Sequence, residues 1–257
     1  MAVSFAADGG IGTITLDRPP ANSYEAGFIA ELGEAVEAAA SDDDAKVVLV
    51  RSASEKFFSA GADIKAFNEN TVEANMEMIR ASHRVLASIA GIPKVFIAEI
   101  AGHALGGGLE IALACDLRFG ADGEHRLGTP EVTLGVLPGN GGTQRLPRLI
   151  SPSRALDLMI TGRTVTTGEA YELGILDRLF PPPELHEQTL AYAQGLASGA
   201  TKAVGNIKLA VHEGLTAGFE QGLEREQELI EELFRSEDAK EGIAAFGEKR
   251  KPAFAGH

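Results

Sequence analysis

The chain has 257 residues, 44% of them hydrophobic, which is enough for a substantial core in one large domain or in a core with an appendage. A net charge of −14 repels phosphate backbones over most of the surface, which disfavours nucleic-acid binding. One cysteine, Cys115, excludes an internal disulfide, and no apolar run is long enough to span a bilayer. We therefore expect a cytoplasmic protein that neither enters a membrane nor binds nucleic acid.

Metal and sugar chemistry are also disfavoured. No Cys/His spacing resembles a zinc site, so we predict no metal. The chain lacks Trp and is only 6% aromatic, whereas sugar sites commonly use broad aromatic platforms. A glycoside hydrolase, a class of enzyme that also uses paired carboxylates, is therefore a less suitable interpretation of this chain.

The first half of the chain alternates between strand and helix patterns. Strands are expected at residues 11–16, 47–50, 95–100 and 117–119. Helices are expected at residues 25–40, 70–89 and 107–114. A turn-rich span follows at 135–142. This order predicts an α/β core with largely parallel strands.

The last third of the chain is helical in pattern. Thr166 and Glu169 fit a capping box at a helix start. Further helices are expected at residues 185–197, 201–212, 215–234 and 236–247. One stripe of the helix at 215–234 consists of Leu223, Gln227, Ile230 and Phe234. Such a stripe must be covered, either by the chain's own core or by another subunit.

Three glycines at residues 106–108 follow a predicted buried strand and open a helix that carries Glu110. Unpaired N–H groups at such a helix start favour an anion. A phosphate-binding loop is the obvious competitor, but the chain has neither Gly-Lys-Ser/Thr nor G-x-G-x-x-G. Close helix–strand packing also explains the glycines. A carboxylate in an otherwise apolar helix start, however, is either a site residue or a burial cost.

A second carboxylate, Glu131, follows Thr129 and Pro130 and precedes an apolar, glycine-rich stretch at 132–145. Alone, it fits the start of a surface segment. Together with Glu110 it suggests an acid/base pair, because paired carboxylates can move protons beside main-chain donors that stabilise a developing negative charge.

These segments resemble the crotonase, or enoyl-CoA hydratase/isomerase, superfamily. The resemblance rests on residues 58–65, 102–110, 130–131, 137–146 and 241–252, which match in order and spacing. It implies an α/β fold in which residues 1–195 form a crotonase-like spiral of ββα units. Residues 196–257 would form a helical C-terminal region for assembly into a homotrimer or a dimer of trimers.

The resemblance also implies functional residues. The backbone N–H groups of Ala62 and Gly107 would form an oxyanion hole for an acyl-CoA thioester oxygen, and Glu110 and Glu131 would be the two catalytic acids of the hydratase branch. Coenzyme A contacts are implied at Ala60, Ala62, Asp63, Ile64 and Lys65, with Lys56 as a candidate phosphate contact. Lys249 or Lys251 of a neighbouring subunit would approach the phosphates. No metal or cofactor is implied, because coenzyme A belongs to the substrate.

The implied activity is addition of water to a trans-2-enoyl-CoA to give a 3-hydroxyacyl-CoA, a lyase reaction used in fatty-acid metabolism. We hypothesise that Glu110 is the better base, because a helix N-terminus favours its ionised form. A double-bond isomerase or another crotonase reaction is one alternative, because side chains decide the chemistry around a shared oxyanion hole. A non-catalytic acyl-CoA-binding protein is another.

Three features depart from the family pattern. Glu99 interrupts a strand where the family often has a small apolar residue, and Asn140 stands where Ala is common. Residues 18–24 resemble the family's segment only loosely, so coenzyme A contacts are not expected from them. Cys115 is expected to be a small buried hydrophobic residue.

Overall fold

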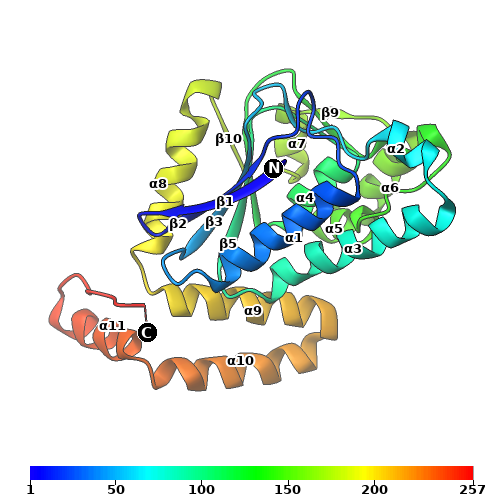
Figure 1. Cartoon of the computed structure of the whole chain (residues 1–257). Coiled ribbons are helices and arrows are strands. Elements are labelled where there is room, and N and C mark those ends of the chain that lie inside the picture. Colours follow the sequence, from blue (N-terminus) through cyan, green and yellow to red (C-terminus); the bar gives the residue numbers. More distant parts are fainter. Residues whose placement is uncertain (257) are drawn as a thin grey trace.

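A six-stranded sheet forms the centre of the computed structural model, which describes residues 1–256 (Figure 1). Its strands, in spatial order, are β1 (Val3–Asp8), β2 (Ile11–Leu16), β3 (Val47–Ser52), β5 (Val95–Ile100), β7 (Leu117–Ala121) and β10 (Arg178–Phe180). The first two form an antiparallel hairpin, and every later pair is parallel. The apolar runs of β3 and β5 suit this position, because a parallel strand is covered on both faces.

A smaller sheet contains β4 (Phe57–Ser59), β6 (His103–Leu105), β8 (Arg126–Gly128) and β9 (Val165–Thr166). After β3, β5 and β7 the chain leaves the large sheet, adds the next strand to the small sheet, and then enters a helix. This repeated ββα path confirms the predicted spiral.

The helices of the core are α1 (Ala26–Ser41), α2 (Ile64–Glu69), α3 (Val72–Gly91), α4 (Gly107–Ala114), α5 (Gly142–Leu149), α6 (Pro152–Thr161), α7 (Thr167–Leu173) and α8 (Leu185–Ala197). Short 3₁₀ helices cover Pro130–Leu134 (η1) and Pro182–Glu184 (η2). The predicted helices at 107–114 and 185–197 have the observed bounds, and those at 25–40 and 70–89 are shifted by one or two residues.

Alternating side chains of the large sheet face two apolar layers. Val48 and Phe96 belong to a cluster with Leu32 of α1 and Leu86 of α3. Val47, Leu49, Ile97 and Phe119 form a second cluster with Leu185 of α8 on the opposite face. Each fully buried side chain of this size stabilises the fold by about 1.5–3 kcal/mol. The sheet is therefore a rigid platform from which the loops of the site project.

The C-terminal region consists of α9 (Thr201–Ala217), α10 (Phe219–Phe234) and α11 (Glu237–Glu248). A break at Gly218, with φ of 105°, separates α9 from α10, so the predicted boundary between residues 212 and 215 was wrong. The two helices pack closely where Gly214 and Gly222 meet. In Figure 1, α11 lies at the opposite end of the molecule from α2.

The apolar stripe of α10 does not pack into the chain's own core. Its exposed fractions are 38% for Leu223, 44% for Ile230 and 65% for Phe234, whereas Leu229 on the other side is 3% exposed. The interpretation of this stripe as intramolecular core was therefore wrong. Its role as a subunit interface stays a prediction.

Thr166 caps α7 as predicted, because its side chain accepts a hydrogen bond from the Glu169 N–H at 3.2 Å. The other half of the capping box was wrong. Glu169 pairs instead with Arg163 at 2.7 Å, since that guanidinium offers a charged donor.

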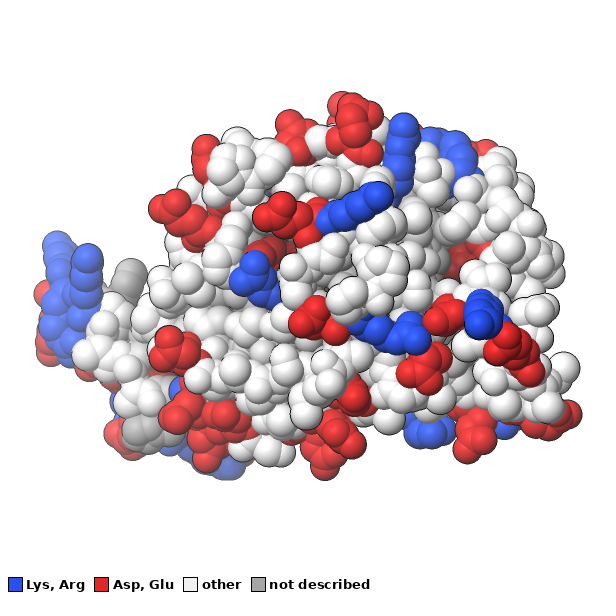
Figure 2. All heavy atoms as spheres, turned by 45° about the horizontal axis from the view of Figure 1, so that its top comes forward, with Lys and Arg blue, Asp and Glu red and all other residues white. Residues whose placement is uncertain are grey.

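Acidic and basic side chains are interspersed with uncharged surface over the face shown in Figure 2. Among the helices of residues 1–256, none is both long and apolar enough to cross a membrane.

Candidate active site

The two predicted backbone donors lie on adjacent segments. A Cβ placed on Gly61 would lie 3.2 Å from the Gly107 nitrogen, and Gly61 has φ of 89°, a conformation that glycine adopts without strain. Around Ala62, the Tyr24 N–H donates to the Gly61 carbonyl at 2.9 Å and the Asp63 N–H donates to the Tyr24 carbonyl at 2.8 Å. Neither of these two hydrogen bonds uses the Ala62 N–H group. Gly107 begins α4, where the first N–H groups lack intrahelical acceptors.

Glu110 lies in the first turn of α4 and is 1% exposed. Its Oε1 accepts hydrogen bonds from the backbone N–H groups of Asn140 at 2.8 Å and Gly142 at 2.6 Å. Burial raises the pKa of Glu110, and the two N–H donors partly offset that rise. The hypothesis that Glu110 is the better base rested on the helix N-terminus. That feature alone does not decide whether the pKa of Glu110 is raised or lowered.

Glu131 lies in η1, which Pro130 opens. Burial, with a smaller contribution from the charge of Glu110, raises the pKa of Glu131 to about 7. A Cβ on Gly106 would lie 3.0 Å from Glu131 Oε1, so the glycine leaves room for this carboxyl group. At neutral pH, Glu131 thus holds a proton part of the time, whereas two N–H donors favour the ionised form of Glu110.

The second oxygen of each carboxyl group lacks a partner. Glu110 Oε2 and Glu131 Oε2 are both buried and accept no hydrogen bond from the described residues. Leaving such an acceptor unsatisfied costs about 1–3 kcal/mol. These two oxygens are therefore suited to a water molecule or a substrate group.

The structure brings four of the predicted coenzyme A contacts together. Ala60, Ala62, Asp63 and Ile64 line a pocket of about 350 Å³. Lys65 is exposed on α2, while Lys56 is exposed elsewhere, with its ammonium group 5.6 Å from the centre of the Phe57 ring, and does not line this pocket.

The other wall of this pocket comes from residues 18–23, from which no contact was expected. It consists of Arg18, Pro19, Pro20 and Ser23. The Asp63 side chain caps α2 by accepting from the N–H of Lys65 at 3.2 Å and also pairs with Arg18 at 3.2 Å. These two interactions hold the Asp63 side chain in the wall of this pocket.

Tyr24 and Asn140 are the polar residues that sequence reasoning missed as members of the site. Each is 4% exposed, and the Asn140 amide Nδ2 donates a hydrogen bond to the Tyr24 hydroxyl. Asn140 was noticed only as a departure from the family pattern, and nothing local marks Tyr24.

Glu99, the other departure, lies outside this constellation. It is 3% exposed and pairs with Arg51 at 3.1 Å and with His186 at 2.9 Å. Its buried charge therefore has partners on β3 and α8.

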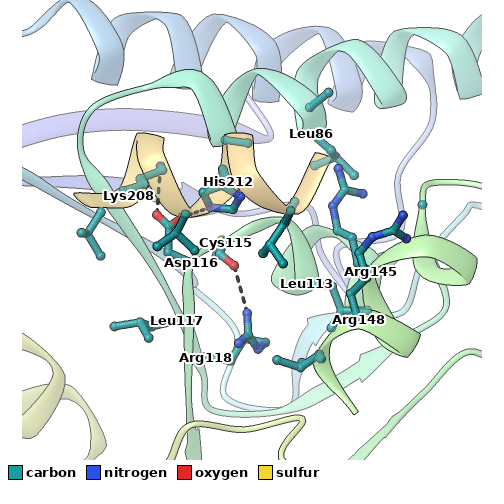
Figure 3. A pocket seen from close by; sticks show the side chains of 18 of the residues that line it. Leu86, Leu113, Cys115, Asp116, Leu117, Arg118, Arg145, Arg148, Lys208 and His212 are labelled. Atoms are coloured by element: carbon teal, nitrogen blue, oxygen red, sulfur yellow. Dashed lines mark hydrogen bonds and ion pairs between the residues drawn. The ribbon is translucent and has the colours of Figure 1, made fainter. Parts of the chain in front are cut away.

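A larger cavity of about 960 Å³ opens between α3, α5 and α9 (Figure 3). There Asp116 pairs with Lys208 at 2.9 Å and with His212 at 2.7 Å, both from α9. Arg145 and Arg148 of α5 project at its side. Burial raises the pKa of Cys115 beside it to about 12, so this residue is a buried hydrophobic group as expected and no ready nucleophile.

Glu110 is buried, Glu131 is partly buried, and Gly107 opens the helix that carries Glu110. Such a pair of carboxyl groups near main-chain N–H groups is suited to acid/base chemistry at a carbon next to a carbonyl. The chain belongs to the enoyl-CoA hydratase/isomerase family, whose model matches residues 6–257.

Individual proteins of the family align over almost the whole chain. A probable enoyl-CoA hydratase of Bacillus subtilis is 35% identical over 99% of both chains. The crystal structure of an enoyl-CoA hydratase from Geobacillus kaustophilus has a TM-score of 0.98 at 47% identity, covering 100% of this chain and 97% of the other. That of an enoyl-CoA hydratase from Bacillus anthracis has a TM-score of 0.94 at 35% identity and covers 100% of both.

Proposed function

We propose that the protein hydrates a trans-2-enoyl-CoA to a 3-hydroxyacyl-CoA. The observation that carries this proposal is the pair of buried, unpartnered oxygens, Glu110 Oε2 and Glu131 Oε2. One water molecule has two hydrogens and can donate one to each carboxyl group. The names of the similar proteins support the same reaction.

In the proposed mechanism the N–H groups of Ala62 and Gly107 bind the thioester oxygen. Water gives one proton to the Glu110 carboxylate while its oxygen bonds to the β-carbon, and electron density moves onto the thioester oxygen. Removing one such donor typically costs about 100- to 1,000-fold in rate, because the donors are already aligned when the charge develops.

Glu131 then completes the addition from its neutral form. It transfers its proton to the α-carbon, and the electron pair on the thioester oxygen restores the carbonyl group. Glu110 has gained one proton and Glu131 has lost one, and exchange with solvent returns both to their starting states. The raised pKa of Glu131, about 7, supports its role as the acid.

Coenzyme A is proposed to lie along Ala60, Ala62, Asp63, Ile64 and Lys65, as part of the substrate and without a metal or further cofactor. Arg18, on the opposite wall of the same pocket, adds a cation that suits phosphate. Lys56 is the least supported of the proposed contacts because it does not line the pocket.

We also propose a cytoplasmic homotrimer or dimer of trimers, with residues 196–257 serving assembly. The exposed stripe of α10 supports this. Lys249 and Lys251, which follow α11 at the far end of the chain from α2, would reach coenzyme A only in a neighbouring subunit. A monomer at micromolar concentration in sedimentation would contradict the assembly.

The reaction is tested by mixing the purified protein with crotonyl-CoA, following the ultraviolet absorbance of the conjugated enoyl group and weighing the product by mass spectrometry. The proposal predicts loss of absorbance with the mass gain of one water. Loss of conjugation without a mass gain would point to an isomerase. Binding without turnover of crotonyl-CoA or longer enoyl-CoAs would point to an acyl-CoA-binding protein.

A further inference from the structure

Tyr24 spans the candidate oxyanion hole. Its backbone bonds to Gly61 and Asp63, on either side of Ala62. Its hydroxyl group lies against Gly107, so closely that a Cβ on that glycine would overlap the phenol oxygen. One buried side chain thus touches both segments that carry the proposed donors.

The Tyr24 hydroxyl is also linked to Glu110 through Asn140. The Asn140 backbone N–H donates to Glu110 Oε1 at 2.8 Å, while its side-chain Nδ2 donates to the Tyr24 oxygen. Because the phenol oxygen already accepts from Asn140, its own hydrogen is free to be donated in another direction.

Besides the donor Asn140, the surroundings of the Tyr24 hydroxyl contain acceptors. Burial raises the pKa of Tyr24, and the charges of Glu110 and Glu131 lie close enough to raise it further. The phenol therefore keeps its proton over the working range of the enzyme. Glu110 Oε2 and Glu131 Oε2, the nearby orphaned oxygens, accept nothing from residues 1–256.

The pairing joins two departures from the family pattern. Asn140 stands where Ala is common, and Tyr24 lies in the segment that resembles the family only loosely. In the folded chain these two side chains contact each other in the middle of the site. An Ala at position 140 has no side-chain donor for this hydroxyl, so the hydrogen bond requires Asn140 as well as Tyr24.

We propose that Tyr24, held by Asn140, is a further catalytic residue whose hydroxyl donates a hydrogen bond to the attacking water between Glu110 and Glu131. The inference rests on the proposed hydration. Tyr24 keeps its proton throughout and forms no covalent bond. It fixes the direction of the water's lone pairs toward the β-carbon while the two carboxyl groups receive the water's hydrogens.

The test compares crotonyl-CoA hydration by the unchanged protein, Tyr24→Phe, Asn140→Ala and the double variant. Tyr24→Phe retains the ring and the backbone bonds around Ala62, so folding and KM should change little. We expect kcat to fall by about 10- to 100-fold, because one preorganised donor to the reacting water is lost. The acidic limb of the pH profile should move to higher pH, since the donor favours ionised Glu110 through the shared water.

Asn140→Ala should produce a smaller loss of kcat in the same direction, because it frees the hydroxyl from its fixed orientation. If the two residues act as one unit, the double variant should be no slower than Tyr24→Phe alone. The matched control is Tyr192→Phe, which removes a hydroxyl from a ring packed edge to face against Phe119 outside the site and should leave kcat unchanged. Circular dichroism and melting curves verify that each variant is folded.

Unchanged kcat and pH profile in Tyr24→Phe would overturn the inference while leaving hydration by the unchanged protein intact. A raised KM with an unmoved pH profile would also overturn it, because that pattern indicates a purely structural role. If the unchanged protein adds no water to enoyl-CoAs, the proposed function fails first and this inference fails with it.

Discussion

Two groups of charged side chains differ in how their carboxylates are paired. At the Asp116 cluster, Lys208 and His212 pair with the carboxylate, and Lys208 also donates to the carbonyl groups of Ile89 and Lys94 at 2.7 Å each. At the glutamate pair, one oxygen of each carboxyl group lacks a partner among the described residues. The first cluster holds α9 against the core, whereas the second leaves acceptor oxygens free to bind a ligand.

Cavity size alone would favour a place other than the glutamate pair. The space beside Asp116, about 960 Å³, is much larger than the pocket of about 350 Å³ near Ala62. Its Asp116 carboxylate, however, is already paired with Lys208 and His212. Unsatisfied buried acceptors are the better guide to chemistry, because their cost is recovered only when a ligand supplies the missing donors.

Substitution of the two glutamates should have the largest effect on activity. Glu110→Gln and Glu131→Gln should each reduce kcat by about 100- to 10,000-fold, because the amide neither accepts nor supplies the required proton. Both variants should fold and still bind acyl-CoA, measured by calorimetry with a saturated acyl-CoA. A near-normal rate in either variant would remove that residue from the mechanism.

At the Asp116 cluster we expect the opposite result, a loss of stability without a loss of activity. Asp116→Asn should lower the free energy of unfolding by about 3 kcal/mol, because it leaves the buried Lys208 ammonium without its counter-charge. Hydration per folded molecule should stay unchanged. Denaturant unfolding and kcat/KM with crotonyl-CoA measure the two effects, and a specific loss of kcat/KM in a stable variant would contradict the separation.

The pH dependence of catalysis sharpens the assignment of roles. Glu131, whose pKa is about 7, must be protonated to act as the acid, so kcat/KM should decline as pH rises through that value. A profile recorded across neutral pH provides the measurement. No decline would show that the neutral form of Glu131 is not required.

The smallest effect is a gain in stability. Because folding raises the pKa of Glu131 from 4.5 to about 7, its stabilising contribution is present at low pH and is lost as pH rises through about 7. Glu131→Gln should therefore stabilise the fold by about 1–2 kcal/mol at about pH 8, a figure reduced for partial exposure, and by less at about pH 5. Melting temperatures at both pH values test this, and an equal gain at each would contradict it.

Sequence patterns predicted many of the long elements, but missed β1 and α6 as well as the short strands. The helix at 107–114 was found because glycines open it, and the strand at 95–100 because all of its residues except Glu99 are apolar. The strands β4, β6, β8 and β9 have only two or three residues each and show no periodicity. The family resemblance, not the local pattern, supplied the ββα spiral.

The same limit applies to the site. Glu110 and Glu131 were found because each lies near unusual glycines. The Tyr24–Asn140 contact joins residues 116 positions apart, so no local pattern reveals it. The participation of residues 18–23 in the pocket near Ala62 likewise depends on tertiary packing.

We propose that the unpartnered oxygens of Glu110 and Glu131 belong to a water-adding site. The most direct measurement incubates the unchanged protein with crotonyl-CoA in water enriched in oxygen-18 and locates the label by mass spectrometry. The account predicts one labelled oxygen at the β-carbon of a 3-hydroxyacyl-CoA. Binding of crotonyl-CoA without formation of any labelled 3-hydroxyacyl-CoA would contradict it.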